Sequence, residues 1–106
     1  MNNKQIYWTS IEYKLEEQHE KYGKLAGGFV YAFVNCHDVE EALTLFKNKL
    51  HQNNLSPFDF EFIKPYEGTE WENKDEQKHF ENLKHQALKY SIVVLDDYYM
   101  YKKENL

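Results

Sequence analysis

The first apolar pattern in the chain is an alternation over residues 6–15. Tyr7, Ile11 and Leu15 share one side of it, and polar residues such as Glu12 fall on the other. A period of two is typical of a strand with one buried face. A helix is the alternative, because Tyr7, Ile11 and Leu15 also follow one another at intervals of four. We favour the strand.

The longest apolar run, residues 29–34, predicts the central strand of a small sheet. It is rich in β-branched and aromatic residues, which suit a pleated surface. Its side chains are apolar on both faces, which is typical of a strand that is covered on both sides. The glycine pair at 27–28 precedes it, and the charged segment 16–24 predicts a hairpin loop that joins it to residues 6–15.

Two helices are predicted between the later strands. Asp38 and Glu41 have the spacing of a capping box, and an apolar stripe continues from there to Leu50. A second helix is predicted to begin at one of two further capping sequences, residues 69–72 or 73–76. Its expected buried stripe consists of Phe80, Leu83, Ala87 and Tyr90.

The remaining strands are shorter. Residues 58–62 alternate phenylalanine with carboxylates, which predicts a strand with three phenylalanines inward, ended by Pro65. Residues 91–95 predict the last core strand, and residues 96–101 either extend it or turn away.

The resulting order is strand, strand, helix, strand, helix, strand over a single domain, residues 1–106. Right-handed crossovers would place both helices on one face of the sheet. We therefore predict an α+β fold, a two-layer sandwich with a four-stranded mixed sheet and two helices on one face, ferredoxin-like in architecture. The other face would stay open and apolar, which predicts a homodimer or a partner bound there. The open face would carry either Phe29, Tyr31 and Phe33, which are our candidates, or Val30, Ala32 and Val34.

Composition and charge narrow the function classes. The chain is 42% hydrophobic and 17% aromatic, as expected for a folded domain. Its net charge is -5 and all 13 basic residues are lysine, which argues against nucleic acid and favours a basic protein partner. The single cysteine, Cys36, excludes an internal disulfide, and no apolar run is long enough to span a membrane. We expect a cytoplasmic protein.

Three sequence motifs suggest a ligand-binding, catalytic or metal site. Tyr31-Ala32-Phe33-Val34 resembles the core of the RNA-recognition motif, in which strand aromatics stack bases, and this implies single-stranded nucleic acid or a flat ligand as an alternative. Cys36-His37-Asp38 gathers a thiol, an imidazole and a carboxylate, although neighbours on a strand point to opposite faces. Glu76 and His79 have a metal-site spacing without a second copy. We expect no catalytic residues, no metal and no cofactor.

The acidic, aromatic segments are the strongest candidates for function. Tyrosine and tryptophan are typical binding anchors, and carboxylates steer a basic partner. A similar mixture occurs on nuclease immunity proteins, which inhibit basic toxins. We therefore predict a non-enzymatic protein-binding module, with immunity-type inhibition as an alternative. The predicted partner-binding residues are Glu70, Trp71, Glu72, Asp96, Asp97, Tyr98 and Tyr99.

Overall fold

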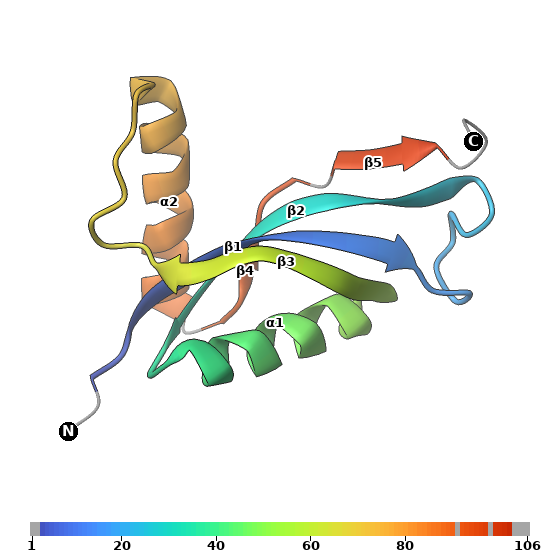
Figure 1. Ribbon diagram of the computed structural model, residues 1–106, viewed down its shortest axis with the longest axis horizontal. Coiled ribbons are helices and arrows are strands. Elements are labelled where there is room, and N and C mark those ends of the chain that lie inside the picture. Colours follow the sequence, from blue (N-terminus) through green and yellow to red (C-terminus); the bar gives the residue numbers. More distant parts are fainter. Residues whose placement is uncertain (1–2, 91, 98, 103–106) are drawn as a thin grey trace.

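The computed structural model describes residues 3–90, 92–97 and 99–102. These residues form one antiparallel sheet and two helices (Figure 1). The strand order is β3-β1-β2-β4, and β5 also pairs with β2, beyond β4. In chain order the elements are β1 (Gln5–Leu15), β2 (Leu25–Cys36), α1 (Val39–Gln52), β3 (Leu55–Pro65), α2 (Lys74–Tyr90), β4 (Val94–Leu95) and β5 (Tyr99–Lys102).

The predicted α+β class and the order of the first six elements are confirmed, and residues 6–15 belong to a strand. Two details differ from the prediction. Every described pairing between two strands is antiparallel, so the sheet is not mixed, and a fifth strand joins it. The long β1–β2 hairpin runs in register from the Gln5–Cys36 pair to the Lys14–Gly27 pair. The predicted strand 6–15 and the predicted central strand 29–34 therefore lie side by side.

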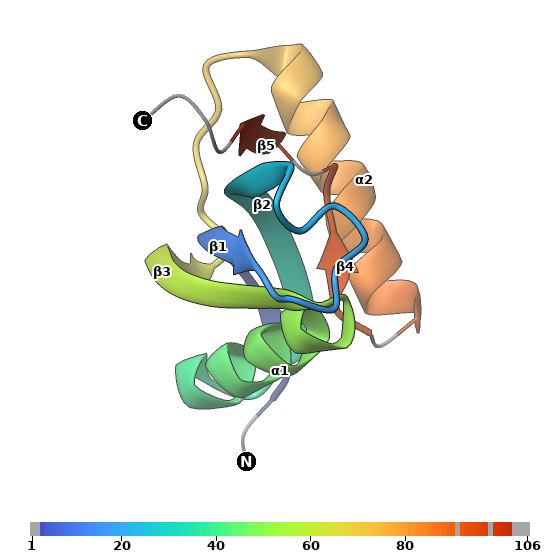
Figure 2. The same cartoon turned by 90° about the vertical axis from the view of Figure 1, so that its right-hand side faces the viewer.

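The helices lie on opposite faces of the sheet, where one face was predicted (Figures 1 and 2). β2 and β3 both run antiparallel to β1, so they are parallel to each other, and the rule of right-handed crossovers applies to α1 between them. β3 and β4 run in opposite directions. The crossover rule therefore does not fix the side on which α2 packs.

Each face of the sheet has its own core. On the α1 face, Val30, Ala32 and Val34 of β2 are buried together with Phe46 and Leu50 of the helix. On the α2 face, the core is largely aromatic, and it also contains Leu83 and Ala87 of that helix. Its buried or half-buried rings are Trp8, Tyr31, Phe33, Phe62, Tyr66, Trp71 and Phe80.

The strand β3 does not keep its three phenylalanines on one face. Ser10 of β1 pairs with Phe62 and the next residue pairs with Phe60, so the residue between them is an extra one on β3. Such a bulge reverses the side-chain alternation. Phe60 accordingly packs on the α1 face and Phe62 on the α2 face. A second register shift falls at Phe58, the extra residue between Pro57 and Asp59, and its side chain is 51% exposed.

The helix starts follow the sequence signals. Asp38 is the N-cap of α1, and its Oδ1 accepts the N–H of Glu41 at 2.8 Å. The Glu41 carboxylate accepts the N–H of His37 at 2.6 Å, one residue before the usual partner, and this bond lowers the pKa of Glu41. For α2 the second candidate is used, because Asn73 Oδ1 accepts backbone N–H groups of the first turn.

The predicted last strand is shortened and interrupted. Of the described residues 92–97, only Val94 and Leu95 form strand pairs with β2, and β5 resumes the pairing at Phe29. Asp96 lies in the interruption, and its N–H donates to the carbonyl of Tyr31 at 2.9 Å. Among the described residues, no helix is both long and apolar enough to cross a membrane.

Candidate functional site

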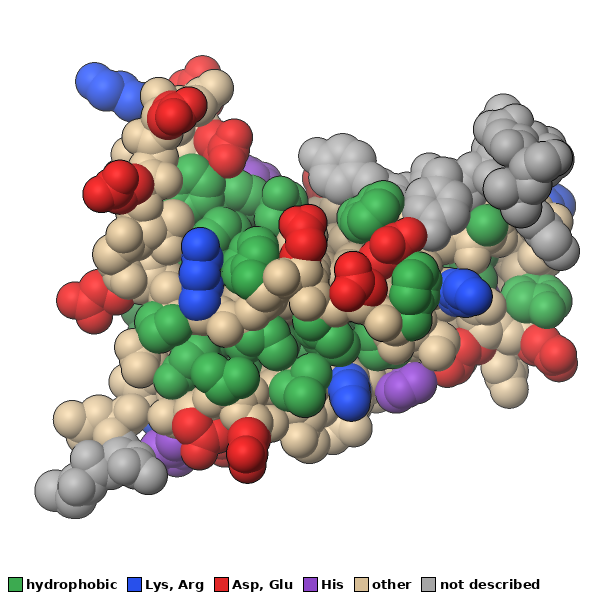
Figure 3. Space-filling model, in the orientation of Figure 1, with side chains coloured by type: hydrophobic (Ala, Val, Ile, Leu, Met, Phe, Trp, Pro, Cys, Tyr) green, Lys and Arg blue, Asp and Glu red, His purple; other side chains and the backbone are tan. Residues whose placement is uncertain are grey.

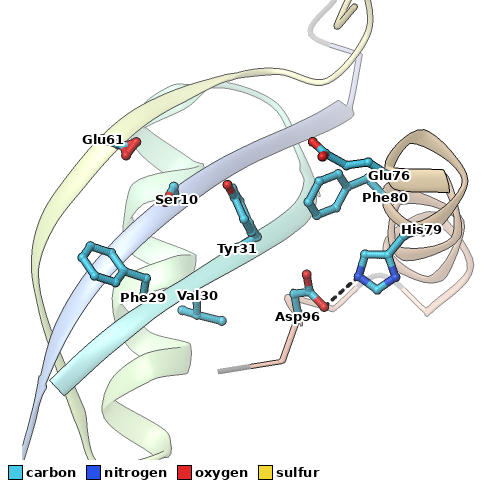
Figure 4. A pocket seen from close by; sticks show the side chains of 9 residues that line it. All are labelled: Ser10, Phe29, Val30, Tyr31, Glu61, Glu76, His79, Phe80 and Asp96. Carbon is cyan, nitrogen blue, oxygen red and sulfur yellow. Dashed lines mark hydrogen bonds and ion pairs between the residues drawn. The ribbon is translucent and has the colours of Figure 1, made fainter. Parts of the chain in front are cut away.

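A hollow of about 510 Å³ lies between the sheet and α2 (Figure 4). Five segments contribute to it, namely β1, β2, β3, α2 and the interruption after β4. Its lining includes three carboxylates and three phenylalanine or tyrosine rings. The lining residues are Ser10, Phe29, Val30, Tyr31, Glu61, Glu76, His79, Phe80 and Asp96.

The helix α2 supplies one wall of the hollow. Glu76, His79 and Phe80 share one helix face, because they stand three and four residues apart. Phe80 is buried, and its ring lies 5.8 Å from both Trp8 and Phe33. This packing sets the distance between α2 and the sheet. It therefore also fixes where Glu76 and His79 stand.

The sheet supplies the floor. Phe29 is 44% exposed and Tyr31 is half-buried, and both lie on the same side of β2. Glu61 is the extra residue of the β3 bulge, and it lines the hollow beside Ser10 of the neighbouring strand. A regular β3 would have put residue 61 on the other face from residue 62. The irregularity thus brings a carboxylate to the site.

Asp96 is the most buried carboxylate of the hollow, with a side chain that is only 9% exposed. Its Oδ1 accepts the N–H of Asp97 at 2.8 Å and lies 2.9 Å from Nε2 of His79. Both described hydrogen bonds of this side chain use the same oxygen. The imidazole of His79, 51% exposed, therefore orients the carboxylate from the solvent side.

The electrostatics of the hollow favour a cation. Glu61, Glu76 and Asp96 converge on it, and none of its described lining residues is a lysine. Figure 3 shows acidic side chains distributed from the top of α2 to the middle of the sheet. Aromatic faces next to carboxylates bind organic cations through ring quadrupole and charge together. No group of three or more potential metal ligands is present among the described residues.

A second hollow of about 410 Å³ holds the predicted segment 70–72. Glu70 and Glu72 line it, but so does Lys64, whose Nζ lies 5.6 Å from the Trp8 ring. Its charge is therefore mixed. Glu76 lines both hollows, so the two predicted acidic segments meet at this residue.

The predicted anchor Trp71 belongs to the aromatic core rather than to the open surface. Its ring lies 5.0 Å from Phe80 and 5.6 Å from Trp8. Beside it, Tyr66 is buried and its hydroxyl donates to Glu81 Oε1 at 3.3 Å. Burial, and secondarily the charge of Glu81, raises the pKa of Tyr66 to about 12. This cluster holds the second hollow in shape.

The other predicted residues are distributed unevenly. Asp97 is exposed beside the first hollow, and Tyr99 pairs with Phe29 through its backbone in β5. The prediction for Tyr98 lies outside the described residues. The prediction that Phe33 lies on the open face is wrong, because its side chain is completely buried beneath α2.

The burial of Phe33 weakens the resemblance to a base-stacking platform. Of the three aromatic positions on that face of β2, the helix covers the last, and only Phe29 is largely exposed. The remaining rings stand among carboxylates, which repel phosphate. The structure thus leaves two rings, not three, facing the hollow from β2.

The thiol of Cys36 is buried, and its Sγ lies 3.4 Å from the carbonyl of Asp38, to which it donates. Burial and then the charge of Glu41 raise the pKa of the thiol to about 11. His37 is exposed and bonds with its ring to Glu41 Oε1 at 3.0 Å. The three neighbours thus do not form a thiol–imidazole pair.

We predict that native Cys36 is almost inert toward iodoacetamide. Because the thiolate is the reactive form, a pKa raised to about 11 slows alkylation near neutral pH on the order of 100-fold relative to the unfolded chain. The rate should rise with pH toward that pKa. Mass spectrometry with and without urea measures both rates. Rapid alkylation of the folded protein would restore Cys36 as a candidate nucleophile.

Sequence reasoning did not assign Ser10, Glu61, Glu76, His79 and Phe80 to one site. A signal existed for the helix, since the spacing of Glu76, His79 and Phe80 places them on one face. That spacing suggested only a metal site and a core residue. No signal existed for Glu61, because its position depends on a bulge.

Comparison of the chain with known protein families, curated proteins and solved structures finds no match. The functional argument therefore rests on the chain's own residues.

Proposed function

We propose that this protein binds a basic segment of another protein in the hollow between the sheet and α2. The observation that carries the proposal is the composition of the hollow. Three carboxylates, Glu61, Glu76 and Asp96, stand around the rings of Phe29 and Tyr31. Carboxylates speed the approach of a basic partner and exclude acidic ones, while the rings supply apolar contact area.

The proposal is a binding role without catalysis. The buried, high-pKa thiol of Cys36 supports this view, because a thiol with a raised pKa is a poor nucleophile near neutral pH. A cytoplasmic location is part of the same proposal. The most specific version of the binding proposal is inhibition of a basic toxin, as in immunity proteins. The support for this version is the surface chemistry of the acidic, aromatic hollow alone.

The experiment compares two variants that lose the same number of charges. One is Glu61→Gln, Glu76→Gln, Asp96→Asn, which neutralises the hollow. The matched control is Glu17→Gln, Glu20→Gln, Glu40→Gln, at exposed positions that do not line it. Tagged wild type and both variants are used to retain proteins from a lysate of the cells that make this protein.

We expect the wild type and the control to retain the same basic protein, and the hollow variant to lose it. Retention should also fall at high salt, because exposed charges are screened. Equal loss in both variants would mean that only net charge matters. Equal retention would remove the hollow from the proposal. Retention that depends on intact RNA would favour the nucleic-acid alternative instead.

A further inference from the structure

We infer that the hollow binds one arginine side chain of the partner, in preference to lysine. This inference rests on the proposed function and names the group that the hollow recognises. Arginine and lysine carry the same charge but differ in shape and in the number of donors. The walls and the acceptors of the hollow distinguish between them.

Two rings on β2, Phe29, which is 44% exposed, and Tyr31, which is half-buried, provide surface for a planar cation, and the buried Phe80 supports Tyr31 from α2. Tyr31 and Phe80 meet edge to face, with centroids 5.1 Å apart and planes inclined at 67°. In Figure 4, Phe29 lies on the sheet, on the side of Tyr31 that faces away from Phe80. A guanidinium group stacks on such faces and is more weakly hydrated than an ammonium, so its transfer from water costs less.

The acceptors are more numerous than an ammonium can use. Asp96 has Oδ2 without a described hydrogen bond, and the carboxylates of Glu61 and Glu76 have no ion pair among the described residues. The side chain of Ser10 lines the hollow from the sheet, beside Glu61. A guanidinium has five N–H donors in a fixed fork, whereas an ammonium has three. A fork can therefore bridge acceptors that come from separate elements.

His79 has a positioning role in this site. Its Nε2 forms a hydrogen bond of 2.9 Å with Oδ1 of Asp96. This contact turns Oδ2, the other oxygen of this nearly buried carboxylate, toward the remaining space of the hollow. An arginine would bind Oδ2 without displacing the imidazole. A carboxylate already oriented by its neighbours loses less freedom when the ligand binds.

The volume of the hollow and the amino-acid composition of the chain indicate which molecule supplies the arginine side chain. A hollow of about 510 Å³ has room for one arginine with its flanking peptide units. These 106 residues contain no arginine, so another copy of them cannot supply this group. The occupant is therefore a segment of a different protein.

The test uses three capped tripeptides, acetyl-Gly-X-Gly-amide, where X is arginine, lysine or citrulline. Citrulline keeps the shape of arginine and removes the charge. Binding to the full chain is followed by two-dimensional NMR of backbone amides at millimolar peptide. We expect the arginine peptide to shift amides at Tyr31, Phe80 and Asp96. The lysine peptide should bind about tenfold more weakly, and the citrulline peptide should cause no shifts.

Variants locate the site. Glu76→Gln with Asp96→Asn should weaken the arginine peptide at least about tenfold, whereas Glu17→Gln with Glu20→Gln should leave it unchanged. The NMR spectrum of each variant shows whether it is folded. Equal binding of lysine and arginine would overturn the preference, and equal binding of citrulline would overturn recognition of a cation.

Free L-arginine is a further arm of the experiment. Binding of the free amino acid without binding of the peptide would overturn a protein source. If no arginine compound binds while the hollow-dependent protein is still retained from lysate, this inference fails and the proposed function stands. If neither is observed, both fail.

Discussion

Replacing Trp8 by alanine should lower the free energy of unfolding by about 3–5 kcal/mol, the usual cost of removing a large buried ring. Trp8 is 6% exposed, and its indole is the centre of the α2-side core. Its ring centroid lies 4.8 to 6.0 Å from those of six other rings, Tyr31, Phe33, Phe62, Tyr66, Trp71 and Phe80. Because a domain of this size has only about 5–15 kcal/mol of stability, the loss is large.

The effect should be concentrated in α2. Phe80 and Leu83 attach this helix to the sheet through the ring cluster around Trp8, whereas α1 is attached on the opposite face. Urea denaturation measures the change in stability, and hydrogen exchange measures which amides lose protection. We expect amides of α2 to exchange faster at low urea while those of α1 change little.

Trp71→Ala is the matched control. The side chain has the same size, but Trp71 is only partly buried at the edge of the same cluster. Its removal should cost about half as much or less, since less apolar area is lost. An equal cost for the two variants, or unchanged protection of α2 in Trp8→Ala, would show that Trp8 is not the centre of this core.

Trp8→Ala should also abolish binding of the arginine peptide in the hollow. Glu76 and His79 depend on the position of α2, and Asp96 depends on His79 for its orientation. A helix that moves on the sheet separates these groups from Tyr31 and Phe29. Binding should therefore be lost even where the variant is still largely folded.

Phe46→Ala should also cost about 3–5 kcal/mol, by emptying the core on the other face. Phe46 is completely buried on α1, in the cluster that contains Ile11, Val34 and Leu50. The sheet lies between this residue and the hollow. We therefore expect urea denaturation to show a large loss of stability, while the arginine peptide still binds the folded fraction with unchanged affinity.

Lys47→Ala provides the control for the helix itself, because it changes the neighbouring exposed residue and should alter stability by less than about 0.5 kcal/mol. A weaker peptide affinity in folded Phe46→Ala would show that the two faces are coupled. A stability loss below about 1 kcal/mol would show that the α1-side core adapts to the missing ring.

The candidate site was predictable only in part. The sequence indicated Asp96 and the acidic segment 70–72 from their mixture of carboxylates and rings. It did not indicate that Glu76 connects the two segments, because that depends on the packing of α2. It also placed Phe33 on the open face, since alternation identifies the two faces of a strand but not which part of a face a helix covers.

The sequence by itself determined most of the elements of this protein. Alternation indicated the long strand β1, the apolar run indicated β2, and the cap Asp38 indicated the start of α1, because each of these depends on residues within a few positions of one another. It left two candidate starts for α2, of which the structure uses Asn73, and it did not specify the fifth strand. Only the tertiary structure decided that α2 lies opposite α1, that a bulge turns Glu61 into the hollow, and that Asp96 meets His79. These features depend on strand direction and register between segments far apart in the chain, which local patterns do not encode.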